Sequence, residues 1–135
     1  MRFKSNREHF KRIAREAQLQ TAKELDKRFR ERIEQPYYWD GFEGRTTYRQ
    51  NGEVVVGALR NIRDTGSLAV SQDMNIKGEG TIVFNWDGNG HTPVVDVYFG
   101  RRTATSYIPG RAWVDTVMAE TNLSHLFIDK LKSLS

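Results

Sequence analysis

Hydrophobic side chains recur every three or four positions over residues 5–34, which predicts one long amphipathic helix. No glycine or proline interrupts this segment, and Ser5 and Asn6 are candidate N-caps. Pro36 marks the end, because the residue before a proline is disfavoured in helical geometry. The apolar stripe is narrow and three of its members are alanine: Phe10, Ile13, Ala14, Ala17, Ala22, Leu25, Phe29 and Ile33. Such a stripe suits packing against another helix, and the helix could project from the domain to dock on another subunit.

Aromatic residues crowd the segment that follows the helix, residues 36–45. Four of them fall within six positions: Tyr37, Tyr38, Trp39 and Phe42. One interpretation is a loop folded over the core, because large aromatic side chains favour burial. The other is a patch that binds a partner, because Tyr and Trp are enriched at the energetic centres of interfaces. The sequence leaves both interpretations open.

Alternating residues and turn signals predict two antiparallel strand pairs in the middle of the chain. Asn51-Gly52 is the strongest two-residue hairpin signal, so residues 46–56 are expected to form a short exposed hairpin. A strand is expected over Ile76–Trp86, followed by a turn at Asp87–Gly90 and a second strand at Pro93–Phe99. One face of the first strand carries alternate apolar residues: Ile82, Phe84 and Trp86.

Two more helices are expected beside these strands. Residues 62–72 are typical of a turn into a short helix, with Asp64, Thr65 and Ser67 as candidate caps. The last helix starts near Arg111, and its stripe is split or kinked at Thr121-Asn122. That stripe consists of Trp113, Val114, Val117, Met118, Leu126, Phe127, Leu131 and Leu134.

The order of elements favours an α+β fold, because helices and strands are segregated along the chain. We expect a long N-terminal helix, a β-hairpin and an antiparallel sheet packed by a C-terminal helix. Residues 1–35 would form a projecting basic amphipathic helix, and residues 36–135 a single α+β domain. A chain of 135 residues is long enough for one such core.

Positive charge is concentrated in the first quarter of the chain. The net charge is +4, and residues 1–34 hold 11 Lys and Arg against 6 Asp and Glu. A basic segment is attracted to phosphates or to an acidic partner surface. A solvated helix of mixed charge is the plainer interpretation, since both signs are interspersed along it.

The sequence offers little that could carry catalysis. There is no cysteine, and His9, His91 and His125 do not have metal-ligand spacing. No phosphate loop is present, because a strand and not a helix is expected after Gly78-Glu79-Gly80. We therefore expect no cofactor, no metal site and no enzymatic activity. We also expect no membrane span and no secretory signal, because no long apolar run occurs.

Three ordered blocks of the chain resemble a family of tailed-phage neck and tail-completion proteins. Arg63–Ser71 looks like that family's Asp-Thr-Gly-x-Leu-x-x-Ser block, and Val97–Gly100 is similar to its strand that ends in an aromatic residue and glycine. Ile108–Trp113 is similar to its Pro-x-Arg-Pro-aromatic entry to the last helix, with Ala112 in place of the second proline. The resemblance covers roughly residues 45–132.

This resemblance implies a structural subunit of the phage neck, acting in the virion after assembly in the host cytoplasm. Such a subunit forms a homo-oligomeric ring, of six copies by analogy or of twelve, that joins the head portal to the tail or terminates the tail tube. Its partners would be its own copies and the neighbouring connector and tail tube proteins. Neck ring, tail terminator and completion factor all stay open as roles.

A ring subunit needs two different surfaces, because neighbours in a ring meet head to tail. One candidate surface combines the first helix and the aromatic loop: Phe10, Ile13, Ala17, Tyr37, Tyr38, Trp39 and Phe42. The other would be the sheet edge over residues 76–99 or the loop at Arg101-Arg102. Basic residues could touch packaged DNA without reading its bases: Arg7, Lys11, Arg12, Arg15, Arg101 and Arg102. The alternative function is a sequence-independent DNA-binding protein built on the basic helix.

Overall fold

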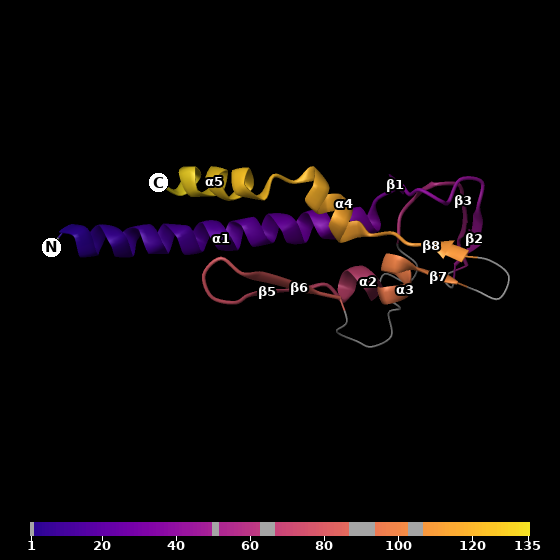
Figure 1. Ribbon diagram of the computed structural model, residues 1–135, viewed down its shortest axis with the longest axis horizontal. Helices are drawn as coiled ribbons and strands as arrows, with labels where there is room; N and C mark the ends of the chain where they lie inside the picture. The colour runs from indigo at the N-terminus through magenta and orange to yellow at the C-terminus, as the bar shows by residue number, and fades with distance from the viewer. Residues whose placement is uncertain (1, 50–51, 63–66, 87–93, 103–106) are drawn as a thin grey trace.

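A helix of 33 residues, α1 (Arg2–Glu34), forms the long axis of the protein. The computed structural model describes residues 2–49, 52–62, 67–86, 94–102 and 107–135. The last helix, α5 (Leu123–Leu134), runs beside α1 on one side, and a β-hairpin lies on the other (Figure 1). The molecule is therefore elongated, with small elements arranged along one helix.

Among the described residues there are three shorter helices: α2 (Ser67–Val70), α3 (Val94–Phe99) and α4 (Trp113–Glu120). The predicted split of the last helix at Thr121-Asn122 is confirmed, since α4 and α5 are separate. Thr121 is extended, and the side-chain oxygen of Asn122 accepts a hydrogen bond from the His125 amide at 3.1 Å. Asn122 therefore caps α5.

The described strands form four antiparallel pairs, none of which joins another into a larger sheet. β1 (Tyr37–Tyr38) pairs with β4 (Leu59–Arg60), and β2 (Thr46–Tyr48) pairs with β3 (Val54–Val56). Further along the chain the pairs are β5 (Asp73–Ile76) with β6 (Ile82–Asn85), and β7 (Gly100–Arg102) with β8 (Tyr107–Pro109). The predicted α+β class is confirmed, with small ribbons in place of one sheet.

The hairpin predicted at residues 46–56 is confirmed as the β2–β3 hairpin. Gly52 has a φ of +88°, the left-handed conformation that favours glycine, and its amide donates to the Arg49 carbonyl at 3.0 Å. Asn51 lies outside the described residues. The candidate helix caps Asp64 and Thr65 also lie outside them.

The prediction of a strand at Pro93–Phe99 was wrong. Of this segment the structure describes Val94–Phe99, which is α3, and β6 pairs with β5 instead. The segment Ile76–Trp86, predicted as one strand, holds the last residue of β5, a tight turn in which Gly78 and Gly80 both have positive φ, and all of β6. In α3 the adjacent residues Val97 and Tyr98 both pack on the core, which a strand's alternation would forbid.

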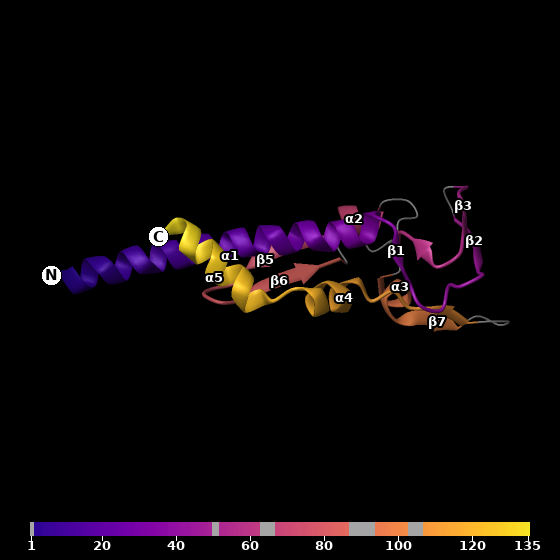
Figure 2. The same cartoon turned by 90° about the horizontal axis from the view of Figure 1, so that it is seen from above.

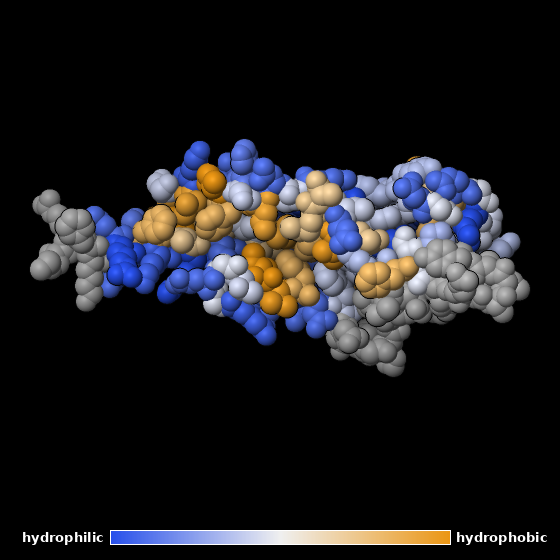
Figure 3. Space-filling model, viewed as in Figure 1, coloured by the Kyte–Doolittle hydropathy of each residue, from blue (hydrophilic) through white to orange (hydrophobic). Residues whose placement is uncertain are grey.

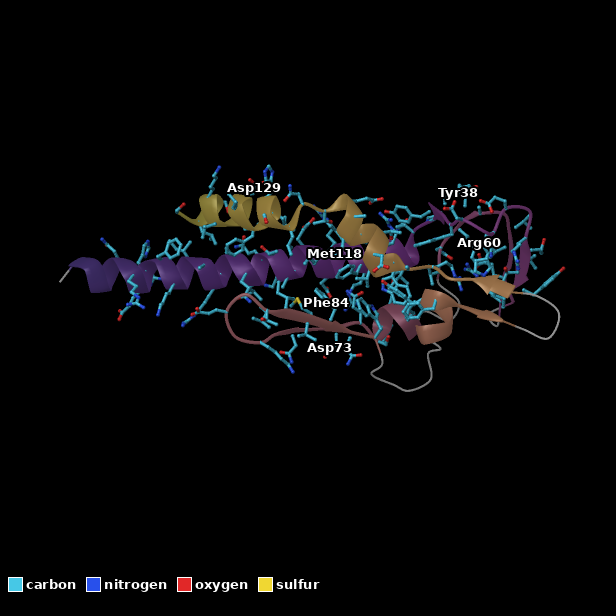
Figure 4. The ribbon with its side chains drawn as sticks, viewed as in Figure 1. Tyr38, Arg60, Asp73, Phe84, Met118 and Asp129 are labelled. Atoms are coloured by element: carbon cyan, nitrogen blue, oxygen red, sulfur yellow. The ribbon has the colours of Figure 1, made fainter. Side chains whose placement is uncertain are left out.

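A chain of aromatic contacts links the elements on both sides of α1. Phe29 of α1 lies edge-on to Phe84 of β6, with ring centroids 4.8 Å apart, and Trp86 lies edge-on to Trp113 at 5.6 Å. Trp113 at the start of α4 is fully buried. Phe84 and Met118 of α4 both pack against α1 (Figure 4). The core therefore follows the C-terminal half of α1.

The two halves of α1 differ in burial. Buried apolar side chains line the half that ends at Glu34: Ala17, Ala22, Leu25, Phe29 and Ile33. By contrast, residues 6–12 are all exposed, and this part of α1 extends past the hairpin (Figure 2). Ile33 shares a core cluster with Trp113, so the core crosses the domain boundary predicted at residue 35. No helix in the described part of the chain is long and apolar enough to cross a membrane.

Candidate interface along the first helix

A hollow opens where the N-terminal half of α1 meets the start of α5 and the tip of the β5–β6 hairpin. Its volume is about 600 Å³. Five of its lining residues are apolar: Phe10, Ala14, Ile82, Leu123 and Phe127. Hydrophobic side chains gather over α5 and, across α1, over the hairpin (Figure 3). We call this feature the apolar groove. Contiguous exposed apolar surface is typical of an interaction site.

The walls of the groove follow from local sequence. Phe10 and Ala14 are four residues apart and so share one face of α1. The side-chain amide of Gln18 donates to the carbonyls of Gly78 and Thr81, at 3.2 and 3.3 Å, which holds the hairpin tip against α1. Gln18 is buried, so these bonds satisfy a polar group that water does not reach.

A second hollow, of about 830 Å³, shares Arg15, Gln18 and Glu79 with the apolar groove. Its apolar lining comes from the same three elements: Ile13, Leu19, Ile76 and Leu134. Ile13 is half-buried here. The N-terminal half of α1 is therefore only partly covered by the chain's own elements.

The rim of the apolar groove is basic. Arg7, Lys11 and Arg15 line it, and all three are exposed. Arg15 approaches Glu79 at 3.8 Å, an exposed ion pair that contributes little to stability. Arg12 is also exposed and contacts the His9 ring. Four of the residues predicted to contact DNA thus lie on one accessible stretch of helix. Arg101 and Arg102 form part of β7, but their side chains lie outside the description.

The predicted interface residues of α1 separate into outward and inward positions. Phe10 is 60% exposed and lines the apolar groove, whereas Ala17 is completely buried. Ala17 therefore belongs to the chain's own packing and cannot contact a partner in this structure.

The aromatic loop divides in the same way. Trp39 and Phe42 are buried in the core, which matches the interpretation of a loop folded over it. Tyr37 is half-buried and stacks with the Arg32 guanidinium, 3.9 Å from the ring centroid. Tyr38 points outward and donates a hydrogen bond to Glu43 at 2.5 Å. Of the four aromatics, only Tyr38 presents most of its surface to a partner.

Sequence reasoning missed the part of the groove that other elements supply. Leu123 and Phe127 come from the start of α5, and Ile82 from β6. Phe127 belongs to the apolar stripe predicted for the last helix and Ile82 to the apolar face predicted for a strand, but no local signal in the sequence brings either of them to α1. A second exposed apolar surface was also missed, at the β2–β3 hairpin: Tyr48, Val54, Val56 and Leu59.

Three arginines crowd together beneath that hairpin. The guanidinium carbons of Arg60 and Arg111 lie 4.4 and 5.1 Å from the Phe42 ring centroid. Burial, followed by the charges of Arg49 and Arg60, lowers the pKa of Arg111 to about 10. Arg60 donates to the carbonyls of Gly57 and Arg45 and to the Thr47 hydroxyl, which fixes the hairpin to β4.

Elsewhere, close contacts of carboxylates join one element to another. Tyr98 of α3 donates to Asp115 of α4 at 2.5 Å, and burial together with this bond raises the pKa of Tyr98 to about 12. Arg32 of α1 pairs with Glu120 of α4. Within the described ranges, no group of three His, Asp or Glu side chains is placed to hold a metal ion. These contacts position α3 and α4 against the core.

The described residues of the three resembling blocks lie together in the structure. Leu68 and Ala69 of the first block and Trp113 of the third share one core cluster. The Arg111 amide of the third block donates to the Val97 carbonyl of the second at 2.8 Å. In comparisons with known proteins, no protein-family model, no curated protein and no solved structure matches the chain.

Proposed function

We propose that this chain is a non-catalytic structural subunit of a tailed-phage neck, assembled in the host cytoplasm and carried in the virion. Copies of it form a ring that joins the head to the tail or terminates the tail tube. The phage assignment is supported by the three ordered sequence blocks, which pack against one another around Trp113. The ring assignment is supported by the exposed surface of the molecule.

The observation that carries the proposal is the apolar groove. Phe10 is mostly exposed on a helix whose other half is well buried, and Leu123 faces the same hollow. A small protein gains no stability from leaving such side chains in water, so their burial is expected on association. The basic rim around the apolar floor matches the polar rim and apolar centre of protein interfaces.

The size of the assembly in solution tests this proposal. Sedimentation velocity and light scattering of the purified chain should show a closed oligomer at micromolar concentration. Phe10→Glu should shift the population toward monomer, because it places a charge on the groove floor. A chain that stays monomeric alone and together with portal and tail tube proteins would exclude the ring.

A second candidate function is sequence-independent DNA binding by the first helix. Its support is the accessible row of Arg7, Lys11, Arg12 and Arg15. Such binding depends steeply on salt, since phosphate contacts release counterions. Tight binding of isolated monomers to duplexes of unrelated sequence, lost between about 50 and 200 mM salt, would favour this function. Weak binding under the same conditions would favour the structural role.

A further inference from the structure

The β2–β3 hairpin carries the second exposed apolar surface of the molecule. Thr46 pairs with Val56 and Tyr48 with Val54, so these side chains share one face of the ribbon. Val56 is 67% exposed, and Leu59 of the adjoining β4 is exposed beside it. We call the surface formed by Tyr48, Val54, Val56 and Leu59 the hairpin face.

The hairpin face is supported from beneath, although its outer side is exposed. Thr47 and Val55 alternate with the exposed residues and are half-buried. The Arg60 guanidinium donates to the Thr47 hydroxyl at 2.7 Å from beneath. A surface that is fixed before binding loses little entropy on association.

The two apolar surfaces lie at opposite ends of the long axis. The β2–β3 hairpin occupies one end, and α5 and the N-terminal half of α1 occupy the other (Figures 1 and 2). One copy cannot bring its own hairpin face to its own apolar groove. Two copies arranged head to tail can do so.

The charges around the two surfaces are complementary. Exposed carboxylates accompany the hairpin end: Asp40, Glu43 and Glu53. Two of the positive side chains beneath this end, Arg49 and Arg60, are buried, whereas Arg45 is half-buried. The groove rim carries the opposite sign, with Arg7, Lys11 and Arg15. Charges arranged in this way favour encounter and fix orientation.

We infer that the hairpin face of one copy docks in the apolar groove of the next copy. This inference rests on the proposed ring and names its repeated contact. Because the two surfaces differ, the contact is heterologous and leaves one free surface of each kind on a dimer. Addition of further copies continues until the ring closes.

Two complementary variants test the contact. Val56→Lys places a positive charge on the hairpin face, opposite a basic rim, and Leu123→Glu places a negative charge in the groove, opposite acidic residues. Each variant alone should associate at least about tenfold more weakly than the wild type. It should sediment as monomer at concentrations where the wild type forms rings. An equimolar mixture should recover association, because the intact hairpin face of Leu123→Glu can dock in the intact groove of Val56→Lys.

Matched controls separate the contact from general effects on folding. Ile128 lies on the same helix as Leu123 but does not line the groove, and the two are 42% and 41% exposed. Val70 is 78% exposed and belongs to neither surface. Ile128→Glu and Val70→Lys should assemble as the wild type does. Thermal melting of all four variants verifies that each is folded.

Cysteine cross-linking gives a direct second measurement, because the chain has no cysteine of its own. Copies with Val56→Cys, mixed with copies with Leu123→Cys, should form a disulfide-linked dimer under mild oxidation. Val70→Cys mixed with the same partner should not, since a disulfide requires Cα atoms within about 7 Å.

The outcomes separate this inference from the proposed function. Assembly of both Val56→Lys and Leu123→Glu into normal rings would overturn the contact and leave the ring standing. Loss of assembly in Leu123→Glu but not in Val56→Lys would show that the groove receives a different surface. A wild-type chain that never assembles, even with its neighbours, would remove the ring and the contact together.

Discussion

At the scale of single residues, the closest packing occurs where the resembling blocks meet. A Cβ atom on Gly110 would lie 2.5 Å from the Tyr98 carbonyl oxygen and 2.6 Å from the Phe99 carbonyl carbon. Both atoms belong to the backbone and cannot rotate away. Glycine at this position therefore lets the entry to α4 rest directly on the junction between α3 and β7.

Gly110→Ala should lower the free energy of unfolding by about 1–3 kcal/mol, because overpacking at this contact forces the backbone to shift. Urea denaturation monitored by tryptophan fluorescence measures the change. Gly44→Ala is the comparison, since a Cβ there meets no atom within 4 Å and adds only the strain of a φ of +70°. Equal losses of unfolding free energy in the two variants would show that the close contact at Gly110 does not require glycine.

The Tyr98 phenol gives the stability a dependence on alkaline pH. Its pKa is about 12 in the folded chain, against about 10 when unfolded, so the folded state holds this proton more tightly. The resulting stability is complete below about pH 10 and is lost as the pH rises toward 12. Wild type should exceed Tyr98→Phe by about 1 kcal/mol at neutral pH, and urea titrations should show this difference shrinking over that interval. A difference that stays constant across it would contradict the assignment.

At the scale of elements, the sequence predicted those whose signals are local. The long helix, the β2–β3 hairpin and the break at Thr121-Asn122 depend on periodicity, turn residues and caps. The pairing of β6 is not a local property, because both the segment before it and the segment after it could pair with it. The alternation of residues 93–99 resembled a strand, so the later segment was predicted as the partner instead of β5. The glycines at positions 78 and 80 were the missed signal, because a strand interrupted by two glycines is better interpreted as a hairpin turn.

The candidate site was predictable only in part, for a related reason. The α1 stripe located Phe10 and Ile13, but burial depends on which elements pack over the stripe. Ala17 and Phe10 are equivalent in the helical pattern. In the structure, however, Ala17 is enclosed and Phe10 is left exposed by the elements that pack on α1. A single sequence does not show where along α1 these elements end.

The cap of α5 makes a test at this scale. Asn122→Ala removes the acceptor of the His125 amide and should cost about 1 kcal/mol in unfolding free energy. Fraying at this end should also displace Leu123 and weaken assembly. Asn122→Asp keeps an oxygen acceptor and should retain both properties, as measured by denaturation and sedimentation. Full assembly of the alanine variant would show that the Asn122 cap is not needed to position the apolar groove for association.

At the scale of the whole molecule, the fold and the proposed assembly depend on different parts of α1. Buried positions begin at Ala17, whereas residues 6–12 are exposed. A chain that lacks residues 1–11 should therefore melt within a few degrees of the wild type in circular dichroism. It should fail to form rings in sedimentation, because Phe10 and two basic residues of the rim are gone. A large loss of melting temperature would show that the exposed half of α1 supports the fold.

The side-by-side course of α1 and α5 has a practical consequence for labelling. Leu134 and His9 line one hollow, so the N-terminal part of α1 and the C-terminal end of α5 lie at the same end of the molecule (Figure 1). A fluorescent protein joined to either end would crowd the surface inferred to receive the next copy. Reporters for imaging would therefore be better carried as a small dye on an exposed side chain at mid-length, such as a cysteine introduced at Val70.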